Sequence, residues 1–358
     1  MIIAIPLLAS ACGGSSSSTS PPPGGAPLLP ATAPVSAAST PTPSISPVPL
    51  PTYQAGINLL FYSDPGYQSA LPSLLAQLHR DSVNSVAVAF PFYQATLTAN
   101  SVASGSGTPP DSQLEGLLDS LEASGFSVML RPLMDESDLA PQWRGAIEPT
   151  SLTGWFTSYT SLLTHYAKMA AATHVQAFDI GTELYSLEGY TNDWEELIGA
   201  VRSVYPGALT YSVNGISETE GTIRDGFWSD LDFVGVDAYW DLGVPNGTGA
   251  SQMAQAWAPY LSAILSAAGA RRVVITEVGV APQEGEQDHP WESLQPGPTS
   301  AAFQSTYYTG ACQAAGKASV SGIYWWEANL GTAESYDPLG KPAEQAMATC
   351  FAAATAGA

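Results

Sequence analysis

Residues 57–64 read Ile57-Asn58-Leu59-Leu60-Phe61-Tyr62-Ser63-Asp64 and decide the fold. The stretch begins as a buried strand of large apolar residues and ends in polar ones. A doubly wound open sheet normally carries a glycine-rich phosphate turn directly after its first strand. Because no such turn follows here, we favour a closed (β/α)₈ barrel, a TIM barrel of the α/β class, over the open sheet.

From Tyr53 onward, short apolar segments alternate with longer amphipathic ones. The predicted strands are Gly56–Phe61, Ser85–Phe90, Ser127–Arg131, Gln176–Thr182, Leu209–Val213, Phe233–Ala238, Arg272–Thr276 and Gly322–Trp326. The predicted helices between them are Leu71–His79, Leu114–Ala123, Leu152–Ala172, Trp194–Val204, Met253–Ala267 and Ala301–Ala315. Strands that alternate with helices form a parallel sheet, and eight repeats over about 300 residues suit a TIM barrel.

The residues before this domain have a different composition. Ile2 to Ala11 form a short apolar run that ends in small residues before Cys12, like the tail of a bacterial lipoprotein signal. Residues 13–52 are dense in Pro, Ser, Thr and Ala and cannot bury a core. We therefore predict a signal segment at 1–12 with a lipidated Cys12, a tether at 13–52, and a (β/α)₈ domain at 53–358. An ordinary cleaved signal with an incidental cysteine is the alternative.

These features predict a secreted lipoprotein of the cell envelope, on the outer surface or in the periplasm. The net charge of −22 arises from 32 acidic residues against 10 Lys and Arg, which argues against nucleic-acid binding. A neutral ligand such as a sugar is not repelled by this charge.

In an oxidising compartment Cys312 and Cys350, both on predicted late helices, can pair, although two unpaired buried thiols remain possible.

Two glutamates fall at equivalent strand ends of the predicted barrel. Glu183 follows the fourth strand and Glu277 closes the seventh. The chemistry of such barrels sits at the C-terminal ends of the strands, so these carboxyl groups can converge across the barrel mouth. A separation of about 5–5.5 Å suits a retaining double displacement at an anomeric carbon, whereas about 6.5–9.5 Å suits inversion.

Other polar and aromatic residues gather at the same strand ends. We expect Arg131 to keep Glu277 ionised, because a nearby cation stabilises a carboxylate, although Arg131 can instead pair with Asp135 or Glu136. Tyr239 can donate a hydrogen bond to Glu277. The side chains of tryptophan residues offer flat apolar faces on which a pyranose ring can stack. The further candidates for contact with sugar are Asn214, Asp237, Trp143, Trp155, Trp291 and Trp326; Asp237 can instead orient Arg131.

Two short motifs carry a resemblance to a known group of enzymes. Gly181-Thr182-Glu183-Leu184 and Thr276-Glu277-Val278-Gly279 look like the retaining clan of barrel glycosidases, whose acid/base and nucleophile follow strands four and seven. Within that clan, the chain resembles glycoside hydrolase family 113 in Arg131-Pro132-Leu133, in the loop from Trp143-Arg144-Gly145 to Pro149, in Val234-Gly235-Val236-Asp237-Ala238-Tyr239-Trp240 and in Tyr324-Trp325-Trp326. The similarity spans about residues 55 to 350.

The resemblance implies specific roles. Glu183 would be the acid/base, Glu277 the nucleophile, and β-1,4-mannan or glucomannan the substrate. Much of the clan has Asn before the acid/base, where it binds the sugar 2-hydroxyl; here that position is Thr182, which can still offer a hydroxyl. We expect a monomer without a cofactor.

Other functions remain open. Hydrolysis of another β-glycan, such as a glucan or galactan, is the nearest alternative. A non-catalytic carbohydrate-binding surface lipoprotein and a structural surface protein are the alternatives from other classes. The four histidines, at 79, 165, 174 and 289, are scattered rather than placed at strand ends, so we predict no metal site.

Overall fold

The computed structural model describes residues 49–215, 219–292, 298–330 and 336–356. Within these ranges, eight parallel strands pair in sequence order and the last pairs with the first, so the sheet is a closed barrel. This confirms the predicted fold. Cys12, the signal segment and nearly all of the tether lie outside the described residues. No helix in the described ranges is long and apolar enough to cross a membrane.

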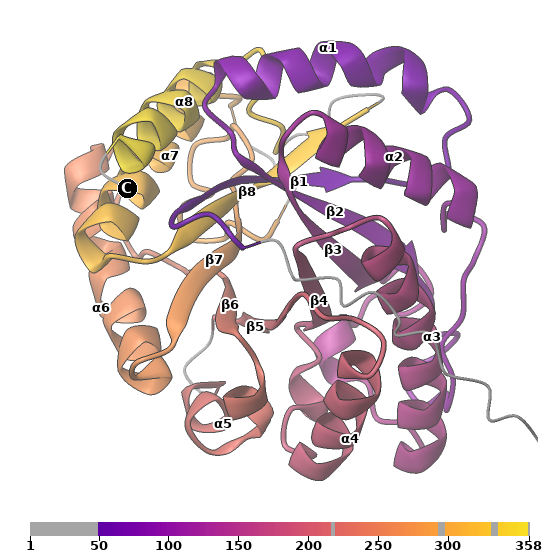
Figure 1. The fold of residues 1–358 in the computed structure, drawn as a ribbon. Coiled ribbons are helices and arrows are strands. Elements are labelled where there is room, and N and C mark those ends of the chain that lie inside the picture. Colours follow the sequence, from indigo (N-terminus) through magenta and orange to yellow (C-terminus); the bar gives the residue numbers. More distant parts are fainter. Residues whose placement is uncertain (1–48, 216–218, 293–297, 331–335, 357–358) are drawn as a thin grey trace, which may run out of the picture. The chain divides into compact units, whose positions relative to one another are not determined.

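The strands line the centre of Figure 1 and the helices surround them. The strands are β1 (Gln54–Leu60), β2 (Ser85–Phe92), β3 (Ser127–Met134), β4 (Ala177–Thr182), β5 (Ala208–Asn214), β6 (Phe233–Asp237), β7 (Arg272–Val278) and β8 (Gly322–Asn329). The helices are α1 (Tyr67–Arg80), α2 (Asp111–Ala123), α3 (Leu152–Ala172), α4 (Thr191–Arg202), α5 (Thr219–Asp225), α6 (Ala250–Ala268), α7 (Ala301–Ala318) and α8 (Pro342–Thr355). Short 3₁₀ turns cover Arg144–Ala146, Tyr185–Leu187 and Phe227–Asp230.

Four strands, β2, β3, β7 and β8, run two or three residues beyond their predicted ends. The predicted second strand ends at Phe90 and the predicted third at Arg131, and a proline follows each in the sequence. In the structure Pro91 and Pro132 lie inside β2 and β3, near the strand ends, where they pair in register with the neighbouring strand. A missing N–H is tolerated at a strand end, so proline there marks no boundary.

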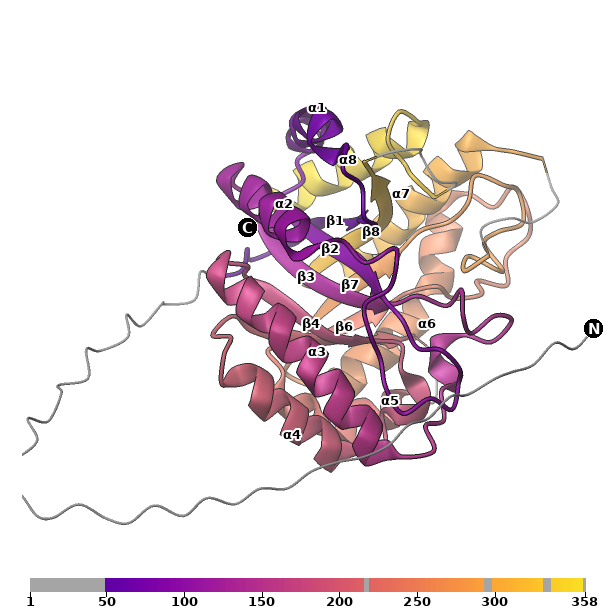
Figure 2. The same cartoon turned by 90° about the vertical axis from the view of Figure 1, so that its right-hand side faces the viewer.

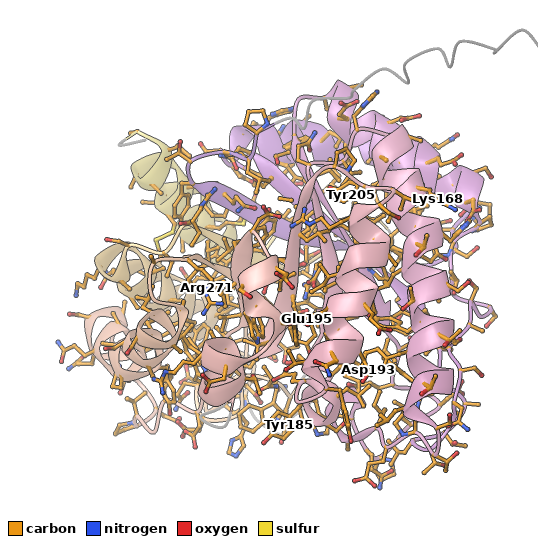
Figure 3. The ribbon with its side chains drawn as sticks, turned by 60° about the horizontal axis from the view of Figure 1, so that its bottom comes forward. Lys168, Tyr185, Asp193, Glu195, Tyr205 and Arg271 are labelled. Carbon is orange, nitrogen blue, oxygen red and sulfur yellow. A yellow bond between two sulfur atoms is a disulfide. The ribbon has the colours of Figure 1, made fainter. Side chains whose placement is uncertain are left out.

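The strands are buried on both faces, because side chains fill the barrel and helices cover its outside (Figures 1 and 2). Adjacent side chains of β8 point in opposite directions. Trp325 is fully buried on the outer side and stacks on Tyr308 of α7, with ring centroids 4.0 Å apart. The next residue, Trp326, points the other way and lines a cavity. In Figure 3, Asp193 lies near the start of α4 and Tyr205 just beyond its end.

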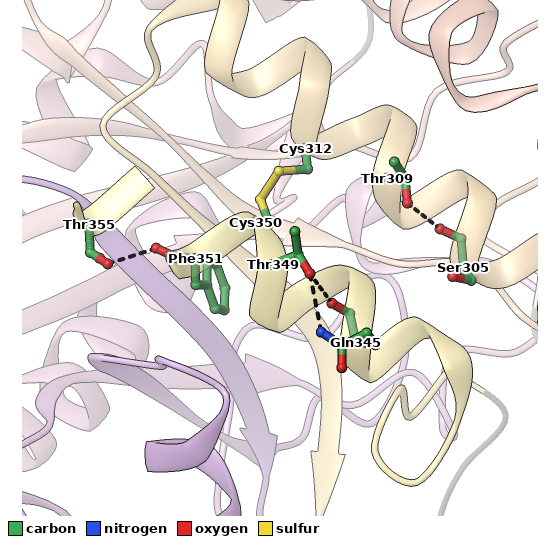
Figure 4. Close-up of a disulfide and its surroundings, with 8 residues drawn as sticks. All are labelled: Ser305, Thr309, Cys312, Gln345, Thr349, Cys350, Phe351 and Thr355. Atoms are coloured by element: carbon green, nitrogen blue, oxygen red, sulfur yellow. Dashed lines mark hydrogen bonds between the residues drawn. A yellow bond between two sulfur atoms is a disulfide. The ribbon is translucent and has the colours of Figure 1, made fainter. Parts of the chain in front are cut away.

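A disulfide joins Cys312 of α7 to Cys350 of α8 (Figure 4). The two Cα atoms lie 5.9 Å apart and the cysteines are separated by 38 residues. Closing a loop of this size stabilises a fold by about 2–4 kcal/mol. The bond therefore ties the last helix of the barrel to its neighbour.

Candidate active site

A cavity of about 1050 Å³ lies at the C-terminal ends of the strands. Seven of the residues that line it were candidates from the sequence: Glu183, Glu277, Asn214, Tyr239, Trp143, Trp291 and Trp326. Seven were not assigned to the site: Leu60, Tyr62, Glu136, Pro141, Arg144, Glu327 and Tyr336. Both glutamates therefore face one space, which is large enough for a carbohydrate ligand.

Glu277 is held by two neighbours in the cavity floor. Arg131 Nη1 lies 2.9 Å from Glu277 Oε1 as an ion pair. The hydroxyl of Tyr239 donates a hydrogen bond of 3.1 Å to Glu277 Oε2. Burial, with the charge of Glu277, raises the pKa of Tyr239 well above its ordinary value, so the phenol keeps the proton that it donates. One carboxylate oxygen thus faces a cation and the other a phenol.

Arg131 is fully buried at the centre of a larger polar cluster. Its Nε donates to Asp179 at 2.9 Å, its Nη1 to Asn58 Oδ1 at 2.9 Å, and its Nη2 lies 3.4 Å from Asp237 Oδ2. Burial alone would lower the pKa of Arg131, but the charges of Glu277, Asp237 and Asp179 outweigh it and raise that pKa. The guanidinium is therefore charged and fixed in orientation beneath the cavity.

Three residues that we predicted to bind substrate lie below the cavity rather than in its wall. Arg131 and Asp237 are part of the buried cluster, and the hydroxyl of Thr182 accepts a hydrogen bond of 3.2 Å from Arg131 Nη2. Thr182 is almost completely buried, because as the last residue of β4 its side chain points into the barrel interior. Thr182 is not among the residues that line the cavity, and its contact with a sugar hydroxyl stays a prediction.

The alternative partners suggested for Arg131 are engaged elsewhere. Glu136 forms an ion pair of 2.7 Å with Arg144, and Asp135 accepts a hydrogen bond of 2.8 Å from Tyr62. Arg131 therefore pairs with Glu277 and with the carboxylates of the barrel interior, while Arg144 lines the cavity.

Glu183 has an unusual backbone conformation. Its φ is 54°, in the left-handed region, which costs a residue other than glycine about 1–3 kcal/mol. Its Oε1 accepts a hydrogen bond of 2.8 Å from Asn214 Nδ2. Burial raises the pKa of Glu183 to about 7; the charge of Arg144 opposes this rise and that of Glu277 adds to it. A carboxyl group with such a pKa can give and take a proton near neutrality.

The tryptophans divide between the cavity and the core. Trp143 and Trp326 are half-buried in the cavity wall, and Trp291 is 51% exposed at its edge. Trp155, which we also considered for sugar binding, is fully buried in α3, and its Nε1 donates to Gln94. It lies on the face of α3 that packs against the barrel, so it is a core residue.

Two members of the site carried a sequence signal that we did not use. Asn58 and Asp179 are polar residues inside strands that are otherwise apolar, and both are fully buried. A buried polar group needs a partner, so a charge within a core strand predicts an interior ion pair. Within the described residues, no group of three or more His, Cys, Asp or Glu side chains is placed to hold a metal ion.

A parallel barrel with two glutamates facing one cavity at its C-terminal end is the arrangement of a glycoside hydrolase. The sequence agrees: residues 66–340 match the model of Glycoside Hydrolase Family 113, and the chain belongs to that family. The resemblance noted from the motifs is thereby confirmed. A glycoside hydrolase acts on an oligo- or polysaccharide.

Solved structures share the fold. A GH113 β-1,4-mannanase superposes with a TM-score of 0.74 at 24% identity, covering 84% of this chain and 99% of the other. A GH113 β-mannanase from Alicyclobacillus acidocaldarius gives a TM-score of 0.71 at 23% identity, covering 84% and 97%. A β-glucuronidase from Ruminococcus gnavus gives 0.59 at 11% identity, covering 84% and 50%. No curated protein sequence matches the chain.

Proposed function

We propose that this protein is a retaining glycoside hydrolase that cleaves β-1,4-mannan or glucomannan. The observation that carries the proposal is the contrast between two carboxyl groups in one cavity. Glu277 is fixed by Arg131 and Tyr239, whereas burial raises the pKa of Glu183 to about 7. One group suits a nucleophile and the other an acid/base. The choice of mannan rests on family membership and on the similar structures, which include GH113 β-mannanases.

The mechanism follows from these environments. Glu277 attacks the anomeric carbon while protonated Glu183 donates its proton to the glycosidic oxygen, and the bond to the leaving sugar breaks. Glu183, now ionised, removes a proton from water, which attacks the same carbon and displaces Glu277. The two displacements together retain the anomeric configuration. Trp143, Trp291 and Trp326 supply flat faces for neighbouring sugar rings.

A panel of polysaccharides tests the substrate. We expect the wild-type protein to release reducing ends from β-mannan and glucomannan faster than from β-glucan or galactan, and Glu183→Ala to lose that activity. Nuclear magnetic resonance of the first product should show the β-anomer. Binding of manno-oligosaccharides without release of reducing ends would instead favour the carbohydrate-binding lipoprotein, and faster cleavage of glucan or galactan would reassign the substrate.

The pH dependence of kcat/KM should show a loss of activity as the pH rises through about 7. The acid must be protonated to act, and burial raises the pKa of Glu183 to about 7, so activity is present below that pH and falls above it. The charge of Arg144 lowers the pKa of Glu183. Arg144→Met should therefore move the alkaline limb to higher pH. An unmoved limb in this variant would show that Glu183 does not set it.

The N-terminal sequence supports a location outside the cytoplasm. A short apolar run before Cys12 and a tether rich in Pro, Ser and Thr suit a lipid anchor that holds the barrel away from a membrane surface. We propose a cell-envelope lipoprotein on these grounds.

A further inference from the structure

The two peptide units on either side of Glu183 are supported from β5. The N–H of Glu183 donates to the carbonyl of Ser212 at 2.9 Å. The N–H of Leu184 donates to the side-chain oxygen of Tyr211 at 2.8 Å. Adjacent residues of one strand thus accept from both N–H groups that flank the left-handed turn at Glu183. A backbone conformation that costs energy persists only where its surroundings fix it, and β5 provides that support.

Tyr211 is itself fixed in position. Its ring is fully buried among Trp194, Phe227 and Trp228, with centroids 5.2–5.5 Å away. The phenolic oxygen of Tyr211 accepts the hydrogen bond from the N–H of Leu184, so its hydroxyl proton can be donated to another group. The hydroxyl donates to Glu188 Oε1 at 3.1 Å. The packing holds the ring and the carboxylate sets the direction of the hydroxyl.

Glu188 lies outside the proposed chemistry. Its side chain is almost completely buried, and it does not line the cavity. Oε2 accepts a hydrogen bond of 3.0 Å from Thr222, so both of its oxygens are occupied. Burial raises the pKa of Glu188 to about 7, and the hydroxyls of Thr222 and Tyr211 oppose that rise. A buried carboxyl group is costly unless it is hydrogen-bonded, and the hydroxyls of Tyr211 and Thr222 supply those bonds here.

We propose that Tyr211 and Glu188 are positioning residues that hold the Glu183–Leu184 turn, so that the carboxyl group of Glu183 is aimed at the leaving oxygen. Leu184 N–H, the Tyr211 hydroxyl and Glu188 form one chain of hydrogen bonds leading away from the cavity. The inference deepens the proposed function and rests on it, because it concerns proton donation by Glu183. Neither residue touches substrate.

The test compares two substrates whose leaving groups differ in their need for an acid. A dinitrophenyl β-manno-oligosaccharide loses its leaving group without a proton, whereas the unmodified oligosaccharide requires one. For Tyr211→Phe, which keeps the ring and removes the hydroxyl, we expect kcat/KM on the unmodified substrate to fall about 10- to 100-fold because the acid is misplaced. On the dinitrophenyl substrate kcat/KM should stay near the wild-type value, since it reports steps only up to departure of the leaving group.

Tyr205→Phe is the matched control. Tyr205 is a buried tyrosine whose hydroxyl donates 2.9 Å to the carbonyl of Val175, and Figure 3 shows it at the end of the barrel opposite Tyr185. This variant should lose thermal stability as Tyr211→Phe does, while keeping the wild-type ratio between the two substrates. An equal loss on both substrates in Tyr211→Phe, or no loss on either, would overturn the positioning role.

Two variants of Glu188 give an independent reading if Tyr211→Phe does not fold. Glu188→Gln keeps an oxygen that accepts from Tyr211 and should retain most of the activity on the unmodified substrate. Glu188→Met removes that acceptor and should show the same loss, confined to the substrate that needs an acid. Equal behaviour of the two variants would contradict the proposal. A wild-type protein that cleaves neither substrate would reject the proposed function itself, and the positioning role with it.

Discussion

Glu277→Ala should reduce turnover of β-mannan by roughly 10⁴-fold or more, because it removes the group that forms the covalent intermediate. The fold should remain intact: Glu277 lies in the cavity floor, and its removal leaves Arg131 paired with Asp179 and Asp237. Rates of release of reducing ends, with a thermal melt of the same preparation, measure the two effects separately.

Small anions should restore part of the lost activity. The truncated side chain leaves a space beside Arg131 Nη1 and the hydroxyl of Tyr239, both of which favour an anion. Azide or formate bound there can attack the anomeric carbon of a substrate with a good leaving group. The product should be the α-glycosyl azide, of inverted configuration, which nuclear magnetic resonance identifies.

Glu327→Ala is the control for this assignment. Glu327 is a buried carboxylate that also lines the cavity, whereas Glu277 is the carboxylate that contacts Arg131 Nη1 and the hydroxyl of Tyr239. Glu327→Ala should therefore show no azide rescue. Rescue of Glu327→Ala in place of Glu277→Ala, or full activity of the latter, would move the nucleophile to another residue.

The sequence was sufficient for the barrel and for the two glutamates. Strands buried on both faces read as short apolar runs, and polar residues at their C-terminal ends gather at one mouth in any parallel barrel. Glu183, Glu277 and Tyr239 could therefore be placed from their positions relative to the strands alone.

The cluster beneath the cavity could not be derived in the same way. It joins Arg131 of β3 to Asn58 of β1, Asp179 of β4 and Asp237 of β6, so it depends on which side chains point inward at one level of the barrel. A shift of one residue in a strand boundary reverses that direction. Thr182 is a predicted substrate contact because it precedes the acid/base, where much of the clan has Asn, and the direction of its side chain, against Arg131, could not be derived from that position. The left-handed turn at Glu183 has no signal in the residue type at all.

Arg131→Met should destabilise the protein by about 3–5 kcal/mol, because removal of one partner leaves buried charges without compensation. Asp179, Asp237 and Glu277 all lie within 3.4 Å of the guanidinium, and the side chains of Arg131, Asp179 and Asp237 are fully buried. Methionine fills much of the volume, so the loss is electrostatic rather than a cavity effect. Denaturant unfolding measures the change. We also expect activity to fall, since Glu277 loses the cation that holds it.

A second substitution separates charge from packing. Asp179→Asn removes one of the carboxylates that Arg131→Met leaves unpaired, so the double variant should be more stable than Arg131→Met alone, although Asp179→Asn by itself destabilises the wild type. Activity should not return, because the contact with Glu277 is still missing. If the stability losses of the two single variants add up in the double variant, Arg131 and Asp179 act independently. If Arg131→Met causes no loss of stability, the buried carboxyl groups are neutral in the absence of Arg131. The expected coupling arises because one cation serves both the stability of the barrel interior and the orientation of the nucleophile above it.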